Sequence, residues 1–170
     1  MIPTSVWPEH IRDALKEKRF AQVLDWIETE NPCDAGLLKA SVYEWWGKPM
    51  DAVDVLTRAL KNLPGKEHLP YLWYRGLMYV QASMPAWAEQ DFDVFIVKSP
   101  AHPDLAKLAR AYARVLLGDV HGALEDINGL PLGTTLVFDR VVTTKWIIDY
   151  ATAALKRTVL KESNAGNAMI

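Results

Sequence analysis

Apolar residues recur along this chain at helical spacing, in short stretches that end at turn residues. Leu38, Val42 and Trp46 form one such stripe, which stops at Gly47-Lys48-Pro49. Residues three and four apart lie on one face of a helix, and proline suits the first helical turn. The pattern therefore predicts pairs of short helices joined by tight turns. The four predicted hairpins span about 7–32, 33–66, 69–102 and 103–129.

The C-terminal part of the chain is predicted as one further helix. It follows the glycine- and proline-rich break at residues 129–133 and spans about 134–162. Terminal repeats need a partly polar cover, so this segment is interpreted as a capping helix. Trp146 and Ile147 make it apolar on more than one side. A homodimer that buries these two residues across a two-fold axis is therefore one alternative.

One stretch of the chain is repeated. Residues 43–64 are echoed by residues 79–100, 36 positions later. The matched residues of the first copy are Tyr43, Gly47, Pro49, Ala52, Leu56, Ala59 and Pro64. Those of the second copy are Tyr79, Ser83, Pro85, Ala88, Phe92, Phe95 and Pro100. Self-similarity at this period indicates stacked helical hairpins.

The order of these residues resembles the tetratricopeptide repeat (TPR), a helix-turn-helix unit of about 34 residues. Residues 33–66 match best, although Gly36 replaces the consensus tryptophan. Residues 69–102 depart at Ser83, in place of the turn glycine, and at Phe95, in place of alanine. The resemblance implies a single all-α domain over residues 1–170, built as a right-handed superhelix of helix pairs. It also implies a concave groove lined by first helices, which binds peptides, helices or proteins and rarely catalyses.

Composition narrows the classes of partner. Half of the residues are hydrophobic, 24% are charged and the formal net charge is -2, as in an ordinary globular domain. No bulk charge favours nucleic acid or an anionic membrane. The one cysteine, Cys33, provides neither a disulfide nor a metal cluster. Without a signal peptide or an apolar span of about twenty residues, the chain is expected to be soluble and cytoplasmic.

A basic face is the first candidate binding site. Lys107, Arg110 and Arg114 are three and four residues apart, on one face of a first helix, and Arg75 of the preceding hairpin is placed to join them. By the repeat template this face looks into the groove, where arginine would clamp an acidic segment or a terminal carboxylate. The alternative is a surface face paired with acids such as Asp126.

Aromatic residues form the second candidate site. Trp45, Trp73 and Tyr74 project from first helices, and the template aims the two tryptophans at the groove. Tryptophan, tyrosine and arginine are the usual anchors of binding surfaces. Packing within the core or between repeats is the alternative for each.

No motif for catalysis, phosphate binding or metal binding is recognised, so neither enzymatic activity nor a cofactor or metal is expected. The acidic residues Glu89, Asp91 and Asp93 are interpreted as the solvated side of an outer helix. A competing hypothesis is an enzyme that uses Glu44 or Asp34 with Arg110. It is disfavoured because no pair has a spacing that chemistry demands.

These observations favour a non-enzymatic scaffold that holds one protein partner. Three versions stay open: a dedicated chaperone of bacterial secretion, an immunity or antitoxin-like protein that neutralises a toxin, and a self-assembling structural adaptor. The residues do not separate them, because function depends on the groove and not on the fold.

Overall fold

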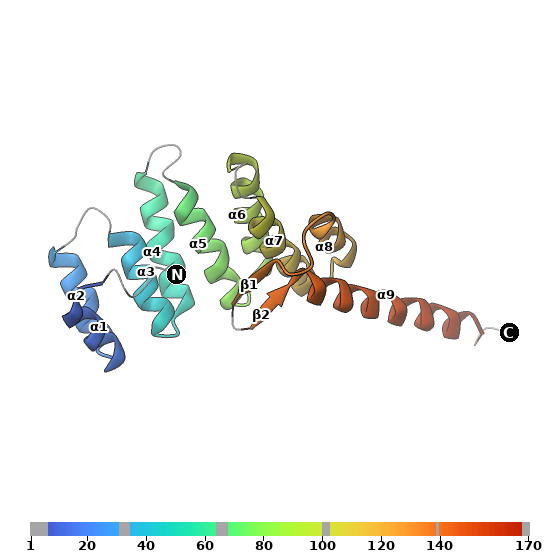
Figure 1. The fold of residues 1–170 in the computed structure, drawn as a ribbon, viewed down its shortest axis with the longest axis horizontal. Helices are drawn as coiled ribbons and strands as arrows, with labels where there is room; N and C mark the ends of the chain where they lie inside the picture. The colour runs from blue at the N-terminus through green and yellow to red at the C-terminus, as the bar shows by residue number, and fades with distance from the viewer. Residues whose placement is uncertain (1–6, 31–34, 64–67, 100–102, 139, 168–170) are drawn as a thin grey trace.

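The computed structural model describes residues 7–30, 35–63, 68–99, 103–138 and 140–167. Within these ranges the predicted all-α helical-repeat fold is confirmed, with helices packed in consecutive pairs along an elongated body (Figure 1). The helices of the four pairs are α1 (Glu9–Lys16), α2 (Phe20–Glu30), α3 (Ala35–Trp45), α4 (Pro49–Asn62), α5 (His68–Gln81), α6 (Pro85–Lys98), α7 (Pro103–Leu117) and α8 (Val120–Ile127). Three pairs lie inside a predicted hairpin range, and the third begins one residue before its range, at His68. Asp34, proposed as an N-cap and as a catalytic acid, lies outside the described residues.

The turns inside the pairs follow from their residues. Pro49 and Pro85 each begin a second helix, where the missing N–H costs nothing. Gly47 adopts a φ of +72°, which side chains rarely tolerate. Ser83 occupies the matching position of the next pair with a φ of +59°. The backbone of this turn is therefore left-handed in both copies, although the second lacks the glycine.

The core runs through the array between adjacent helices. Met78, Phe92 and Leu108 are fully buried, one in each of α5, α6 and α7. Gly76 lies against Phe92, since a Cβ atom at residue 76 would be 2.6 Å from the ring atom Cε1. The glycine therefore makes room for an aromatic ring.

The capping-helix prediction is wrong for residues 135–143. Strands β1 (Thr135–Val137) and β2 (Val141–Thr143) form an antiparallel hairpin in which Leu136 pairs with Val142. The segment is rich in β-branched residues, which favour strands. Val142 is fully buried, whereas Val137 and Val141 are mostly exposed. One face of the hairpin thus covers the end of the core.

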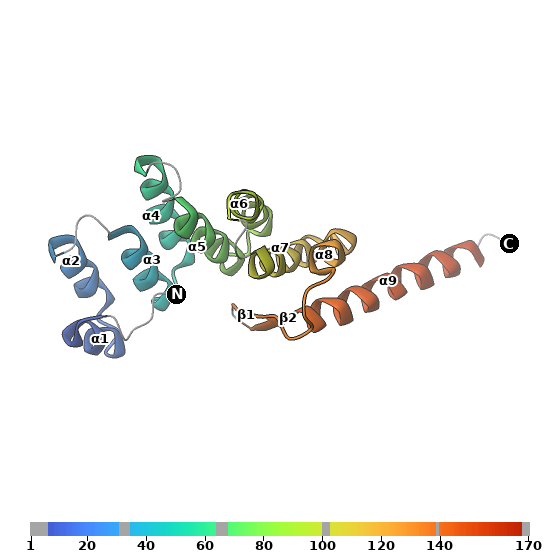
Figure 2. The same cartoon turned by 45° about the horizontal axis from the view of Figure 1, so that its top comes forward.

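The C-terminal helix α9 (Thr144–Asn167) starts directly after β2 and extends away from the other helices (Figures 1 and 2). The Thr143 hydroxyl accepts a hydrogen bond of 3.0 Å from the backbone N–H of Trp146 at its start. Ile147 is fully buried in the chain's own core, and the Trp146 ring packs against Tyr112. Ile147 therefore serves the fold and is not accessible for the alternative of a two-fold contact, whereas Trp146 is only partly buried.

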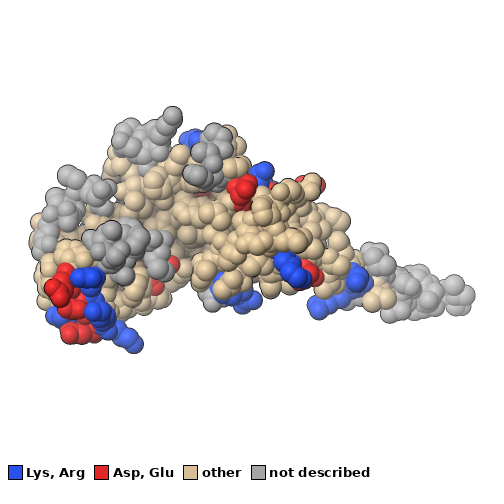
Figure 3. Space-filling view, viewed as in Figure 1, with Lys and Arg blue, Asp and Glu red and all other residues tan. Residues whose placement is uncertain are grey.

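Charged side chains are unevenly distributed over the surface. On the face drawn in Figure 3, blue and red atoms gather at the N-terminal end, and much of the remaining surface is uncharged. Among the described residues, no helix combines the length and the apolar character needed to cross a membrane.

Candidate functional site

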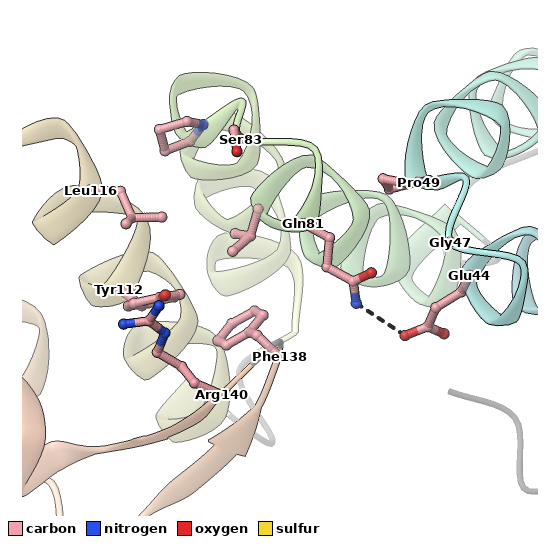
Figure 4. Close-up of a pocket in the computed structure, with 11 residues that line it drawn as sticks. Glu44, Gly47, Pro49, Gln81, Ser83, Tyr112, Leu116, Phe138 and Arg140 are labelled. Carbon is pink, nitrogen blue, oxygen red and sulfur yellow. Dashed lines mark hydrogen bonds between the residues drawn. The ribbon is translucent and has the colours of Figure 1, made fainter.

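A groove of about 760 Å³ crosses the C-terminal ends of the first helices α3, α5 and α7. Its walls include Glu44 of α3, Gln81 of α5, Tyr112 and Leu116 of α7, and Phe138 and Arg140 of the β-hairpin (Figure 4). The volume is in the range of about 300–1,000 Å³ that is typical of ligand pockets. Three repeats and the hairpin thus line one open groove whose walls combine apolar and polar groups.

Glu44 is held in place on the groove wall by α5. One carboxylate oxygen accepts a hydrogen bond of 2.5 Å from the Tyr74 hydroxyl, and the other accepts one of 3.1 Å from the Gln81 side-chain amide (Figure 4 shows the latter). Both donors are neutral. The carboxylate therefore has a fixed orientation on the groove wall.

Tyr74, a predicted binding residue, is only 4% exposed. Its hydroxyl lies 3.1 Å from the Ser41 hydroxyl and donates to Glu44. Burial, and after it the charge of Glu44, raises the pKa of Tyr74 far above its ordinary value. Tyr74 thus remains a hydrogen-bond donor and reaches the groove only through Glu44.

Arg75, another predicted binding residue, forms a bidentate pair with Asp91 of α6. The two hydrogen bonds measure 2.8 and 2.7 Å, and a third, of 3.1 Å, goes to the Thr57 hydroxyl of α4. The hydrogen bonds to Asp91 raise the pKa of Arg75 further. Burial raises the pKa of Asp91, and the bonds from Arg75 oppose that rise only in part. Arg75 therefore joins three helices.

Arg110 and Arg114 point toward the second helices α6 and α8. Arg110 donates to Asp126 of α8, with 2.9 Å from Nε to Oδ2, and to Asp93 of α6 at 2.5 Å. Arg114 donates to Glu89 of α6 at 2.7 Å and to Asp126 at 3.1 Å. The expectation that this face looks into the groove is wrong, because acids on both neighbouring second helices hold the guanidinium groups.

Of the three acids of α6, only Asp93 keeps a large exposed fraction, 49% of its side-chain surface, and all three pair with arginines. Asp91 is buried at 4% exposure, and Glu89 and Asp93 each pair with an arginine of α7. Glu89, Asp93 and Asp126 form an arginine–carboxylate network with Arg110 and Arg114 that connects α6, α7 and α8, and the Arg75–Asp91 pair joins α5 to α6 separately. Lys107 is half-buried and, within the described part of the chain, has no ion pair. The network neutralises most of the proposed basic face.

The two tryptophans have different environments. Trp73 is half-buried, and its ring centroid lies 5.6 Å from that of Phe92 and 5.4 Å from that of Phe95. It lines a second, apolar hollow of about 360 Å³ with Leu105 of α7. Trp45 is 44% exposed and lies outside the lining of the groove. Trp73 thus packs within its own helix pair and borders a hollow shared with α7, and Trp45 faces solvent.

The sequence interpretation missed the hairpin side of the groove. Phe138 packs on Tyr112 with 5.0 Å between ring centroids, and Arg140 lines the same wall. The run Val137 to Thr143 carried a strand signal, but its apolar residues also have a helical spacing. Glu44 was considered only as a catalytic acid with Arg110. The structure gives these two residues separate sets of partners.

Within the described ranges, no group of three or more histidines, cysteines and acids is placed to hold a metal ion. No family model, curated protein or solved structure matches the chain. The TPR resemblance therefore remains an interpretation of the repeated residues, and the argument for function depends on the groove.

Proposed function

We propose that this chain is a non-enzymatic scaffold that holds a segment of a protein partner, a peptide or a helix, in the groove across α3, α5 and α7. One observation carries the proposal: three successive first helices and the β-hairpin line a single open groove of about 760 Å³. Apolar walls with a few convergent polar groups are typical of binding sites. The groove here combines Leu116 and Phe138 with the fixed carboxylate of Glu44.

Adjacent leucines offer a matched test. Leu116 lines the groove and is 46% exposed, whereas Leu117 is 44% exposed and lies outside the groove lining. We expect Leu116→Glu to remove the main proteins that co-purify with the tagged chain from its native cells, and Leu117→Glu to retain them. Quantitative mass spectrometry measures the retention, and thermal melts check that both variants fold. If both variants retain the co-purifying proteins equally, the groove is not the binding site.

The same experiment separates the three versions of the scaffold. A secreted protein as the dominant partner favours the secretion chaperone, and a toxin favours the immunity or antitoxin-like role. Components of one assembly favour the adaptor. Trp45 and Lys107 stay candidates for outer contacts of the partner, since Trp45 is 44% exposed and Lys107, which is partly exposed, has no ion pair among the described residues.

Self-assembly is a second candidate, and the extension of α9 beyond the body favours it (Figure 2). Tyr150 is 45% exposed and Leu160 is 63% exposed on this helix. A homodimer would use this outer part, because Ile147 is buried within the chain. Light scattering at high protein concentration tests the idea: a dimer that Leu160→Glu converts to monomer supports it, and a wild-type monomer contradicts it.

A further inference from the structure

We infer that Glu44 recognises a lysine or arginine side chain of the segment that occupies the groove. The inference depends on the proposed function, because it assigns a chemistry to the occupant of the same groove. The charge inferred for the partner is the opposite of the one suggested by the sequence, which predicted an acidic segment bound to a basic face. The reason is that Arg75, Arg110 and Arg114 are paired with acids away from the groove, whereas Glu44 lies on the groove wall.

The charge of Glu44 has no cationic partner among the described residues. Tyr74 and Gln81, its two hydrogen-bond donors, are neutral. Lys48 is the nearest cation along the chain, and its ammonium group lies 3.6 Å from the centroid of the Trp46 ring. This cation–π contact gives the lysine another partner.

Other carboxylates between helices of this fold, unlike Glu44, are paired with arginines. Asp91 pairs with Arg75, and Asp126 pairs with both Arg110 and Arg114. Partly buried carboxylates are usually paired, because an isolated charge is costly to remove from water. Glu44 lies at an intermediate level of burial in the groove, so an occupant that displaces water would have to supply the missing cation.

The carboxylate is also oriented for a further bond. An ionised carboxylate offers about four acceptor positions, and Tyr74 and Gln81 use one on each oxygen. The remaining positions are open to a cationic donor, whose charge-assisted bond is about twice as strong as a neutral one. Leu116 and Phe138 add apolar wall, and Arg140 lies on the side formed by the hairpin. The expected segment therefore has a basic residue beside apolar ones.

Glu44→Gln is a close test of this charge. The new side-chain oxygen still accepts from Tyr74, and the Gln81 amide can turn over to accept from the new NH₂ group. The shape and the hydrogen bonds are thus retained while the charge is lost. Glu125→Gln is the matched control, since Glu125 is exposed on α8, outside the groove lining.

The probe is a displayed library of random peptides of about fifteen residues, selected on the full chain, with affinities of individual peptides measured by fluorescence polarisation. We expect selected sequences to share a lysine or arginine next to apolar residues. Their affinity should fall about tenfold or more with Glu44→Gln, as for the loss of a charge-assisted bond, and stay unchanged with Glu125→Gln. Should Glu44→Gln fail to fold, replacing the basic residue of the peptide by glutamine must give the same loss on the unaltered chain.

A failure of the inference about Glu44 can be distinguished from a failure of the proposed function. Peptides that need Leu116 but carry no basic residue, or that bind Glu44→Gln as tightly as wild type, would overturn the inference and leave the proposed function in place. The absence of selected peptides, or binding that Leu116→Glu does not weaken, would overturn both.

Discussion

Asp126 is the carboxylate on which the arginine–carboxylate network most depends, and Asp126→Asn tests this directly. Its side chain is 3% exposed and receives hydrogen bonds from both Arg110 and Arg114, whose side chains are each 19% exposed. The hydrogen bonds to Asp126 and Asp93 raise the pKa of Arg110, so this guanidinium stays charged. Asparagine removes the charge and places an amide against cationic donors.

The loss of stability expected for Asp126→Asn is large because the Asp126 carboxylate is buried. Removing one partner of a buried ion pair costs about 3–5 kcal/mol. Because Arg110 and Arg114 keep Asp93 and Glu89, we expect the lower end, about 3 kcal/mol. For a chain of this size, 1 kcal/mol corresponds to about 2–4 °C in Tm, so Asp126→Asn should lower Tm by about 6–12 °C.

Asp93→Asn is the control, because it makes the same chemical change to the same arginine. The Asp93 side chain is 49% exposed, and exposed ion pairs contribute at most about 1 kcal/mol. We expect a fall in Tm of less than about 4 °C. Thermal unfolding followed by circular dichroism measures both variants. Equal shifts would refute the reasoning, and would mean that Asp126 does not hold the arginines in the folded chain.

Two further predictions concern a turn and a buried acid. Ser83→Gly should raise Tm by about 2–4 °C. Glycine relieves the cost of about 1–2 kcal/mol that a left-handed backbone imposes on other residues, and the greater chain entropy of glycine in the unfolded state offsets part of that relief. A lower Tm would contradict this prediction. Arg75→Met should lower the free energy of unfolding at pH 7 by about 3 kcal/mol, because Asp91 is left as a buried, unpaired charge. Burial already raises the folded-state pKa of Asp91 above its ordinary value of 3.8, and losing Arg75 raises it further. A carboxyl with a raised pKa favours the folded state at acid pH and loses that contribution as pH rises through the window above 3.8. The deficit of Arg75→Met should therefore shrink between pH 7 and pH 4 in urea unfolding, and a pH-independent deficit would contradict this account.

Local sequence signals predicted the helix pairs well. Pro49 and Pro85 begin second helices where the repeat placed them, and Gly47 ends its helix with a positive φ. These features are determined by residues that are close together in the sequence, so the sequence alone is sufficient to predict them. The hairpin was missed because Val137, Val141 and Val142 satisfy a helical spacing as well as a strand pattern. Only packing against α7 and α9 selects between them.

The candidate site was harder to predict, because it depends on contacts between distant residues. The spacing of Arg110 and Arg114 correctly indicated one helical face. Which way that face points is decided by Asp126 and Glu89, on helices that the sequence alone does not orient. Glu44 and Phe138 likewise line one groove although they are far apart in the chain. A pattern within one helix does not contain this information.

Site-specific photocrosslinking in the native cells tests the central claim, that a protein partner occupies the groove. A photoreactive amino acid replaces Leu116 in one version of the chain and Leu117 in another, two neighbours with similar exposure of which only the first lines the groove. The account predicts a discrete crosslinked partner from position 116 and little or none from position 117. Crosslinking to a protein partner from position 117 alone would show that the partner binds another surface, and would contradict it.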